Sequence, residues 1–275
     1  MTVEQSAIAG RVVVRRPDIP LRVAAFWCGY SAIFIGLGFV LALAPPSGRM
    51  LVAGLLVTIA SIALTRVLTR SEGASLATAG AAWSRGSVAR FSSGMVFGGV
   101  MIALLVGLSR AAIGPVAFVR NPDASLLAVP MMIATYVALA AGEELGFRGY
   151  PFHRLRDRYG TLTAQVVVAL AFAAYHVLQG WPVINALLGT TAGSVLFGTA
   201  VVATRGLAFP IGLHAAWNLG SWVLGTNGEA GVWRMDLGSE PSFGTVMAVY
   251  LAVMAAGTCA LWRWMPRADV NPAGD

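Results

Sequence analysis

The sequence has few charged residues, no lysine, two cysteines and three histidines. Only 11% of its 275 residues are charged and 57% are hydrophobic, which excludes an ordinary soluble domain. Cys28 and Cys259 both lie inside long apolar stretches, which argues against a disulfide framework or a cysteine metal site. All 19 basic residues are arginines, which suggests a GC-rich bacterial genome.

Long apolar stretches fill most of the chain, each close to the roughly 20 residues that cross a bilayer as a helix. They are 23–44, 50–68, 91–109, 124–147, 161–179, 183–203, 207–226 and 243–264. We therefore predict an all-α, polytopic membrane helix bundle of about eight transmembrane helices. The predicted parts are a cytoplasmic lead (1–22), one bundle (23–264) with its catalytic region at 124–226, and a cytoplasmic tail (265–275).

The arginines predict the orientation of the bundle. With eight spans, one side of the membrane carries only Arg49, Arg110, Arg120 and Arg234, and nearly all other arginines lie at the termini or in the loops of the opposite side. The positive-inside rule then places both termini in the cytoplasm. The net charge of +7 thus reflects membrane topology, and no nucleic-acid partner is expected.

Two adjacent carboxylates and an arginine end the fourth apolar stretch, in the segment AGEELGFR at 141–148. Ionisable groups within a membrane segment are rare and indicate a functional site by default. On a helix, Glu144 and Arg148 share one face in the order that favours an ion pair. Glu143 lies about 100° away and has no cation at that spacing, so we predict an unpaired carboxylate suited to a general base. Pro130 predicts a kink before the glutamates.

Two histidines lie in later apolar stretches, each with a partner on the same helix face. Phe172 pairs with His176 in the fifth stretch, and His214 pairs with Asn218 in the seventh. A single histidine in such a stretch more often has a packing role, but two of them with an unpaired glutamate indicate a shared polar site. Their nominal depths differ by roughly 12 Å, which tilt or a short re-entrant segment must reduce.

These three pairs, in this order, resemble the EExxxR, FxxxH and HxxxN motifs of the CAAX-protease and bacteriocin-processing family of intramembrane proteases. The resemblance covers about residues 124–226, and the first three apolar stretches are similar only in being apolar. It implies hydrolysis of a peptide bond in a cavity open to the membrane or the cytoplasm, without a cofactor.

The resemblance also implies roles for individual residues. Glu143 would act as the general base on a water molecule, and His176 would position that water. His214 and Asn218 would stabilise the oxyanion. The supporting residues would be Glu144, Arg148 and Phe172.

The same residues also allow other interpretations of the protein's function. Glu143, His176 and His214 are enough ligands for a catalytic zinc ion, although the HExxH spacing is absent. The ionisable residues are also compatible with a proton-coupled transporter, although no internal repeat is visible. The third interpretation is that the protein is a catalytically inert relative of these proteases.

The expected partners are the lipid bilayer and a peptide or membrane-protein substrate, with or without a prenyl group. The expected location is the bacterial plasma membrane, as an integral multi-pass protein. The sequence does not identify the natural substrate.

Overall fold

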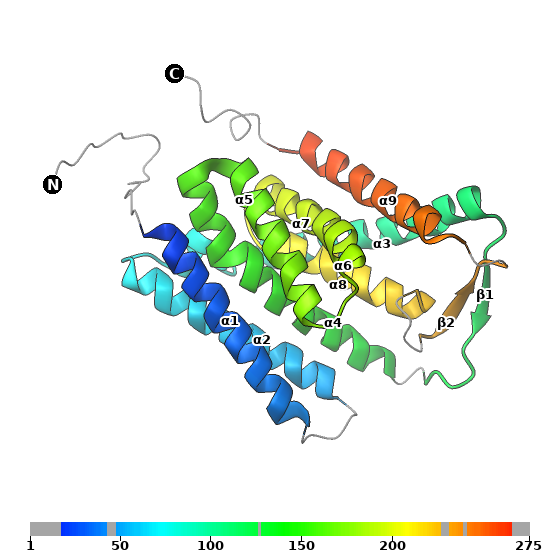
Figure 1. The fold of residues 1–275 in the computed structure, drawn as a ribbon, viewed down its shortest axis with the longest axis horizontal. Coiled ribbons are helices and arrows are strands. Elements are labelled where there is room, and N and C mark those ends of the chain that lie inside the picture. Colours follow the sequence, from blue (N-terminus) through cyan, green and yellow to red (C-terminus); the bar gives the residue numbers. More distant parts are fainter. Residues whose placement is uncertain (1–17, 43–47, 126–127, 227–230, 239–240, 266–275) are drawn as a thin grey trace.

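The computed structural model describes residues 18–42, 48–125, 128–226, 231–238 and 241–265, which form mainly helices (Figure 1). The helices are α1 (Ile19–Ala42), α2 (Arg49–Ser71), η1 (Leu76–Ala79), α3 (Ser87–Ile113), α4 (Ala128–Glu144), η2 (Leu145–Gly149), α5 (Tyr150–Leu178), α6 (Val183–Asn185), η3 (Ala186–Thr190), α7 (Thr191–Thr204), α8 (Ala208–Leu224) and α9 (Phe243–Arg263). Most of the predicted lead and tail lie outside the described residues.

The all-α, polytopic class predicted from the sequence is confirmed. Six helical stretches among the described residues are long and apolar enough to cross a membrane. One of them, Ala128–Leu178, is a 51-residue run that joins α4, η2 and α5, and α8 has 17 residues, the lower limit for a span. The predicted number of eight spans is therefore not confirmed, although each predicted stretch coincides with helical structure.

The kink predicted in the fourth apolar stretch is absent, and the helical run 128–178 is irregular at two other positions. Pro130 lies in the first turn of α4, where its missing N–H removes no helical hydrogen bond, so the predicted kink is wrong. The irregular turn comes after the glutamates instead, as the π-helical η2. A second break falls within α5 at Gly160, whose φ of 83° and ψ of 169° are not helical.

Glycines bring α3 and α8 into close contact. A Cβ atom on Gly94 would lie 2.1 Å from the Phe209 carbonyl oxygen, and one on Gly212 would lie 2.1 Å from the Phe91 carbonyl oxygen. Because both obstacles are backbone atoms of the opposite helix, neither position has room for a larger residue. This contact fixes the position of α8, which carries His214 and Asn218.

The helix α4 is held on its other side by α2. Thr58 donates a hydrogen bond to the Ala138 carbonyl at 2.7 Å, and Ser61 donates to the Gly142 carbonyl at 3.2 Å. Gly142 packs tightly against α2, since an added Cβ atom would lie 3.0 Å from the Val57 side chain, which would have to shift slightly. The helix that carries the glutamates thus lies between α2 and α8 (Figure 1).

A two-stranded antiparallel sheet, which the sequence did not predict, lies at one end of the bundle. Strands β1 (Ala117–Arg120) and β2 (Trp233–Asp236) pair with Ala117 opposite Asp236. They come from the α3–α4 and α8–α9 connections, which therefore lie side by side (Figure 1).

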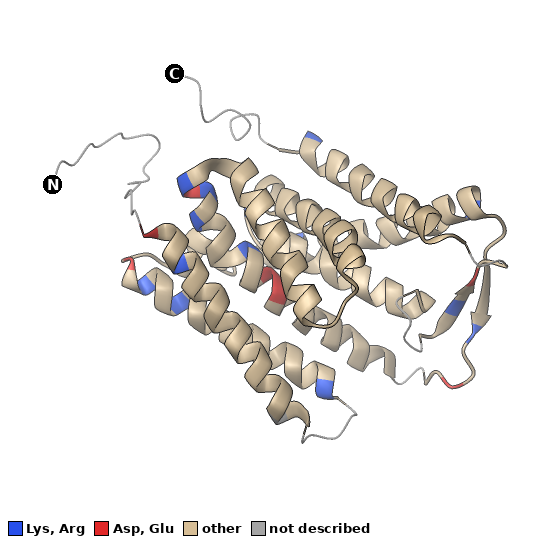
Figure 2. Ribbon diagram, viewed as in Figure 1, with Lys and Arg blue, Asp and Glu red and all other residues tan. Residues whose placement is uncertain are grey.

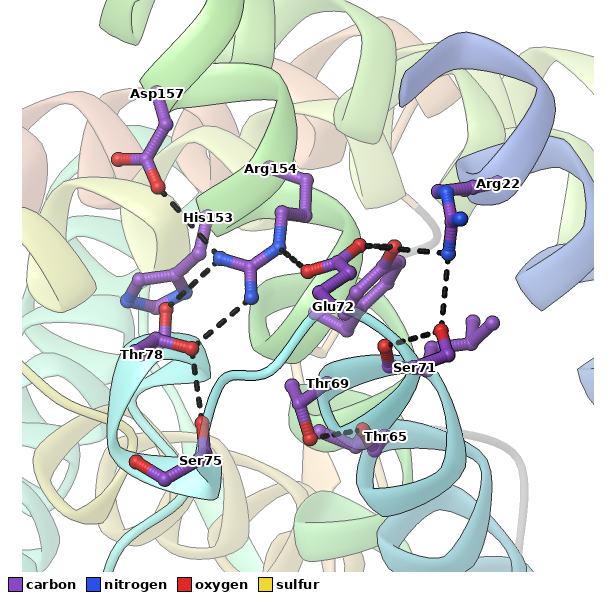
Figure 3. A network of polar contacts seen from close by, with 12 residues as sticks. Arg22, Thr65, Thr69, Ser71, Glu72, Ser75, Thr78, His153, Arg154 and Asp157 are labelled. Carbon is purple, nitrogen blue, oxygen red and sulfur yellow. Dashed lines mark hydrogen bonds and ion pairs between the residues drawn. The ribbon is translucent and has the colours of Figure 1, made fainter. Parts of the chain in front are cut away.

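A polar network ties the other end of the bundle together (Figure 3). Glu72, just after α2, accepts hydrogen bonds from Tyr150 and from Arg154 of α5, the latter at 2.7 Å. Arg154 also donates to the Thr78 hydroxyl at 3.0 Å, and Arg22 of α1 donates to Ser71 at 3.0 Å. Arginines gather at this end, where α1 begins, α2 ends and α5 begins (Figure 2).

Candidate active site

A buried ion pair lies at the centre of the site. Glu144 and Arg148 have side-chain exposures of 0%, and Nη1 of Arg148 lies 3.2 Å from Oε1 of Glu144. Arg148 also donates to the Ser194 hydroxyl of α7 at 2.6 Å, and its Cζ atom lies 4.3 Å from the Phe172 ring centroid. The predicted pairing of Glu144 with Arg148 is therefore present. Among the described residues, Oε2 of Glu144 is buried without a hydrogen-bond partner.

The π-helical turn η2 carries Arg148. The backbone carbonyls of this turn form hydrogen bonds with side chains from α1 and α5. The Trp27 indole of α1 donates to the Gly146 carbonyl at 3.3 Å. Nδ1 of His153 lies 3.0 Å from the Arg148 carbonyl and 2.9 Å from the Gly149 carbonyl. His153 thus contacts the backbone behind the ion pair. Single π-helical turns occur frequently at functional sites.

His214 joins the two glutamates. Its Nδ1 atom lies 2.9 Å from Oε1 of Glu144, and its Nε2 atom lies 3.7 Å from Oε2 of Glu143. The imidazole stacks on the Phe197 ring of α7, with ring centroids 4.4 Å apart and planes inclined by 17°. The Glu144 carboxylate and the Phe197 ring together orient His214, so that its Nε2 atom is directed toward Glu143.

The two glutamates differ in their surroundings. Glu144 is fully buried and contacts Arg148 and His214, whereas 17% of the Glu143 side chain is exposed. In the described part of the chain, Glu143 has one ion-pair contact, to His214. The Glu144 carboxylate is thus held within the bundle, whereas the Glu143 carboxylate remains accessible to a small molecule such as water.

His176 lies beside this cluster, without direct contact to either glutamate among the described residues. Its Nδ1 atom is 2.8 Å from the Phe172 carbonyl, and Trp181 packs edge-on against its ring at 5.0 Å. The Phe172 ring centroid is 4.4 Å from that of His176 and 6.5 Å from that of His214. Phe172 therefore contacts both histidine rings.

Asn218 lies one turn after His214 on α8. Its side chain is partly exposed and has no hydrogen bond to the residues that the structure describes. Its amide is free to contact a bound substrate on the His214 side of the site.

The proposed zinc ligands do not form a metal-binding group. In the described residues, no set of three or more His, Cys, Asp and Glu side chains is arranged to hold a metal ion. Glu143 and His214 are close together, but no ion pair or hydrogen bond joins His176 to either of them in this part of the structure.

Sequence analysis missed several residues that shape the site. Ser194 and Phe197 hold Arg148 and His214 from α7, and Trp27 binds η2 from α1. Serine and aromatic residues are common in membrane helices, so no sequence pattern distinguished these three from packing residues.

Residues 125–220 match the family model described as type II CAAX prenyl endopeptidase, Rce1-like. The match begins just before α4 and ends within α8, so it contains all three motifs. A comparison with curated proteins gave no match. The predicted resemblance is thus confirmed for this region, and the family match supports a membrane protease. The helices α1, α2, α3 and α9 lie outside the matched region.

Proposed function

From this family match and the geometry of the site, we propose that the chain is an intramembrane endopeptidase. It hydrolyses a peptide bond of a membrane-associated protein or peptide with water activated by Glu143. The observation that carries this proposal is the difference between the two adjacent glutamates. Glu144 is buried and bound by Arg148 and His214, while Glu143 is partly exposed beside the Nε2 atom of His214.

In the proposed reaction, Glu143 takes a proton from water as the water oxygen attacks the peptide carbonyl carbon. The carbonyl oxygen becomes an oxyanion, which accepts hydrogen bonds from His214 and Asn218. The tetrahedral intermediate then collapses, the C–N bond breaks, and Glu143 returns the proton to the leaving amine. His176 helps to position this water.

The proposed oxyanion role of His214 requires a protonated imidazole. Nδ1 bonds the Glu144 carboxylate, so Nε2 carries a proton for the oxyanion only when both ring nitrogens are protonated. Two glutamates, one arginine and a protonated His214 give the cluster no net charge. The imidazolium charge is therefore balanced before the oxyanion forms.

The proposal is tested by exchanging each glutamate for glutamine. Purified wild-type protein, Glu143→Gln and Glu144→Gln are assayed with a quenched fluorescent peptide library and a prenylated CAAX peptide. Glu143→Gln keeps the size of the side chain but removes the base, so we expect kcat to fall by about 10²- to 10⁴-fold with near-normal thermal stability. Glu144→Gln should lower both activity and folded yield, because it leaves Arg148 without its buried charge partner.

Three controls separate this proposal from its alternatives. Activity that survives a chelator supports glutamate-activated water, whereas loss that zinc restores supports the metal alternative. If Glu143→Gln remains active and Glu144→Gln folds but is inactive, the roles of the two acids are reversed. Failure of the folded wild-type protein to cleave any peptide would favour an inert relative or a transporter.

A further inference from the structure

Tyr30 of α1 presents a buried hydroxyl group that the proposed mechanism does not use. Its side chain is 3% exposed, and its hydroxyl makes no hydrogen bond of regular geometry within the described part of the chain. The Tyr175 hydroxyl is a close polar neighbour. A buried hydroxyl without a partner is costly, so its presence calls for a ligand or a function.

The position of Tyr30 is fixed against the glutamate motif. A Cβ atom on Gly146 would lie 2.5 Å from the Tyr30 ring, so the absence of a side chain there allows the contact. Trp27, one turn earlier on α1, bonds the Gly146 carbonyl. The Tyr30 ring packs edge-on against the Phe147 ring with centroids 5.5 Å apart, and Phe147 packs edge-on against Phe172 at 4.9 Å. Helix α1 thus forms part of the site although it lies outside the region matched by the family model.

A groove of about 180 Å³ opens beside Tyr30, between α1 and α5. It is lined mainly by Trp27, Tyr30, Phe147, Ala171, Ala174 and Tyr175. The walls are apolar apart from hydroxyl groups, and an apolar cavity of about 150 Å³ is known to accept benzene. The groove therefore has the size and the chemistry to hold one large apolar side chain.

We propose that Tyr30 positions the substrate. Its hydroxyl donates a hydrogen bond to the peptide backbone beside Glu143, and the groove holds a large apolar side chain of the peptide next to the scissile bond. This inference rests on the proposed peptidase function and adds to it the class of substrate, a peptide with a phenylalanine- or leucine-sized residue at that position.

The first test removes only the hydroxyl group. Tyr30→Phe keeps the ring contacts and should raise KM by up to about tenfold with little change in kcat, because the lost bond holds the bound substrate. Its melting temperature should fall less than that of the control below, since the Tyr30 hydroxyl has only the irregular contact with the Tyr175 hydroxyl. The matched control is Tyr250→Phe, which removes a hydroxyl that donates to the Gly189 carbonyl at 3.0 Å. The control should lower the melting temperature and leave KM unchanged.

The second test fills the groove. Ala174→Phe adds a ring from the α5 wall and should shift the preferred substrate residue from large to small in peptides that differ only at that position. Leu170→Phe places a similar ring at a position of the same helix that is 54% exposed and outside the groove lining, and should leave the preference unchanged. Unchanged KM in Tyr30→Phe together with unchanged preference in Ala174→Phe overturns the inference.

Photochemical cross-linking tests the inference without requiring peptide cleavage. A peptide with p-benzoylphenylalanine at the varied position is irradiated with the Glu143→Gln protein, and the labelled residues are identified by mass spectrometry. We expect labels within residues 27–31 or 171–178, and less labelling in Ala174→Phe. Labels elsewhere, or labels that phospholipid alone displaces, overturn the inference even if the peptidase function holds. If no peptide is cleaved, the same labelling still decides whether the groove binds peptide.

Discussion

At the scale of residues, two neighbouring glutamates differ because the helix directs them to different surroundings. Glu144 faces Arg148 and His214 inside the bundle, while Glu143 retains some exposure. A buried charge is tolerated only when it is paired and hydrogen-bonded. Arg148 meets this condition through Glu144, Ser194 and the face of the Phe172 ring.

Arg148→Met tests this pairing. The substitution keeps an apolar stem but leaves the Glu144 charge without its strongest partner, so we expect a loss of about 3–5 kcal/mol in the free energy of unfolding. Unfolding in detergent, followed by circular dichroism, measures the change. Arg66→Met, which alters an exposed arginine of α2, is the control and should change stability by less than about 0.5 kcal/mol. Equal stability of both variants would contradict a structural role for the ion pair.

The sequence predicted the Glu144–Arg148 pair because their spacing on a helix is fixed. It also indicated that His214 belongs with the glutamates, and in the structure His214 contacts both of them. It did not predict that His214 bonds Glu144 through Nδ1, nor that Phe172 contacts both histidine rings. Such details depend on how helices far apart in the sequence are rotated against one another.

At the scale of elements, glycines determine how closely the helices that carry the site approach. The spacing of Gly94 and Gly98 in α3 fits close packing, and both glycines lie against α8. The similar pair Gly189 and Gly193 makes only ordinary contacts with Tyr250, at 4.0 and 3.4 Å. The same sequence pattern thus has a packing role in one helix and no close backbone contact in the other.

Gly212→Ala tests the contact between α3 and α8. Its methyl group would overlap the Phe91 carbonyl, so α8 must move, and we expect a loss of about 1–3 kcal/mol in stability. Activity should fall further than stability explains, because His214 lies two residues later on the displaced helix. Thermal unfolding and peptide cleavage at a temperature where the variant is folded measure the two effects.

The control for Gly212→Ala is Gly99→Ala. Gly99 lies on α3 with no atom within 4 Å of an added Cβ, so alanine should be neutral or stabilise the helix by up to about 1 kcal/mol. If both variants have the same stability and activity, close packing at Gly212 does not position His214.

The apolar stretches predicted the helices well, because a bilayer requires long runs of apolar residues. They did not predict the π-helical turn η2, whereas the break at Gly160 coincides with the predicted start of the fifth stretch at residue 161. They also did not predict strands β1 and β2, which have four residues each and form only because their two connections meet.

At the scale of the whole molecule, the two ends of the bundle differ in charge. One end has the Glu72 network, which joins α1, the end of α2, η1 and the start of α5 (Figure 3). The other end has the β1–β2 sheet, with Arg120 and Arg234. The pairing of β1 with β2 requires the α3–α4 and α8–α9 connections to lie on the same side, as the predicted topology also requires.

We therefore expect the Glu72 network on the cytoplasmic side and the sheet on the opposite side. In bacterial cells, green fluorescent protein fused to the C-terminus should be fluorescent, and alkaline phosphatase inserted after Arg120 should be active. The matched control inserts the phosphatase after Gly73, next to the Glu72 network, where it should be inactive. The reverse pattern would place the arginine-rich end outside and contradict the prediction. Activity at both insertion sites would instead mean that the two connections lie on one side of the membrane, against the arrangement of the helices.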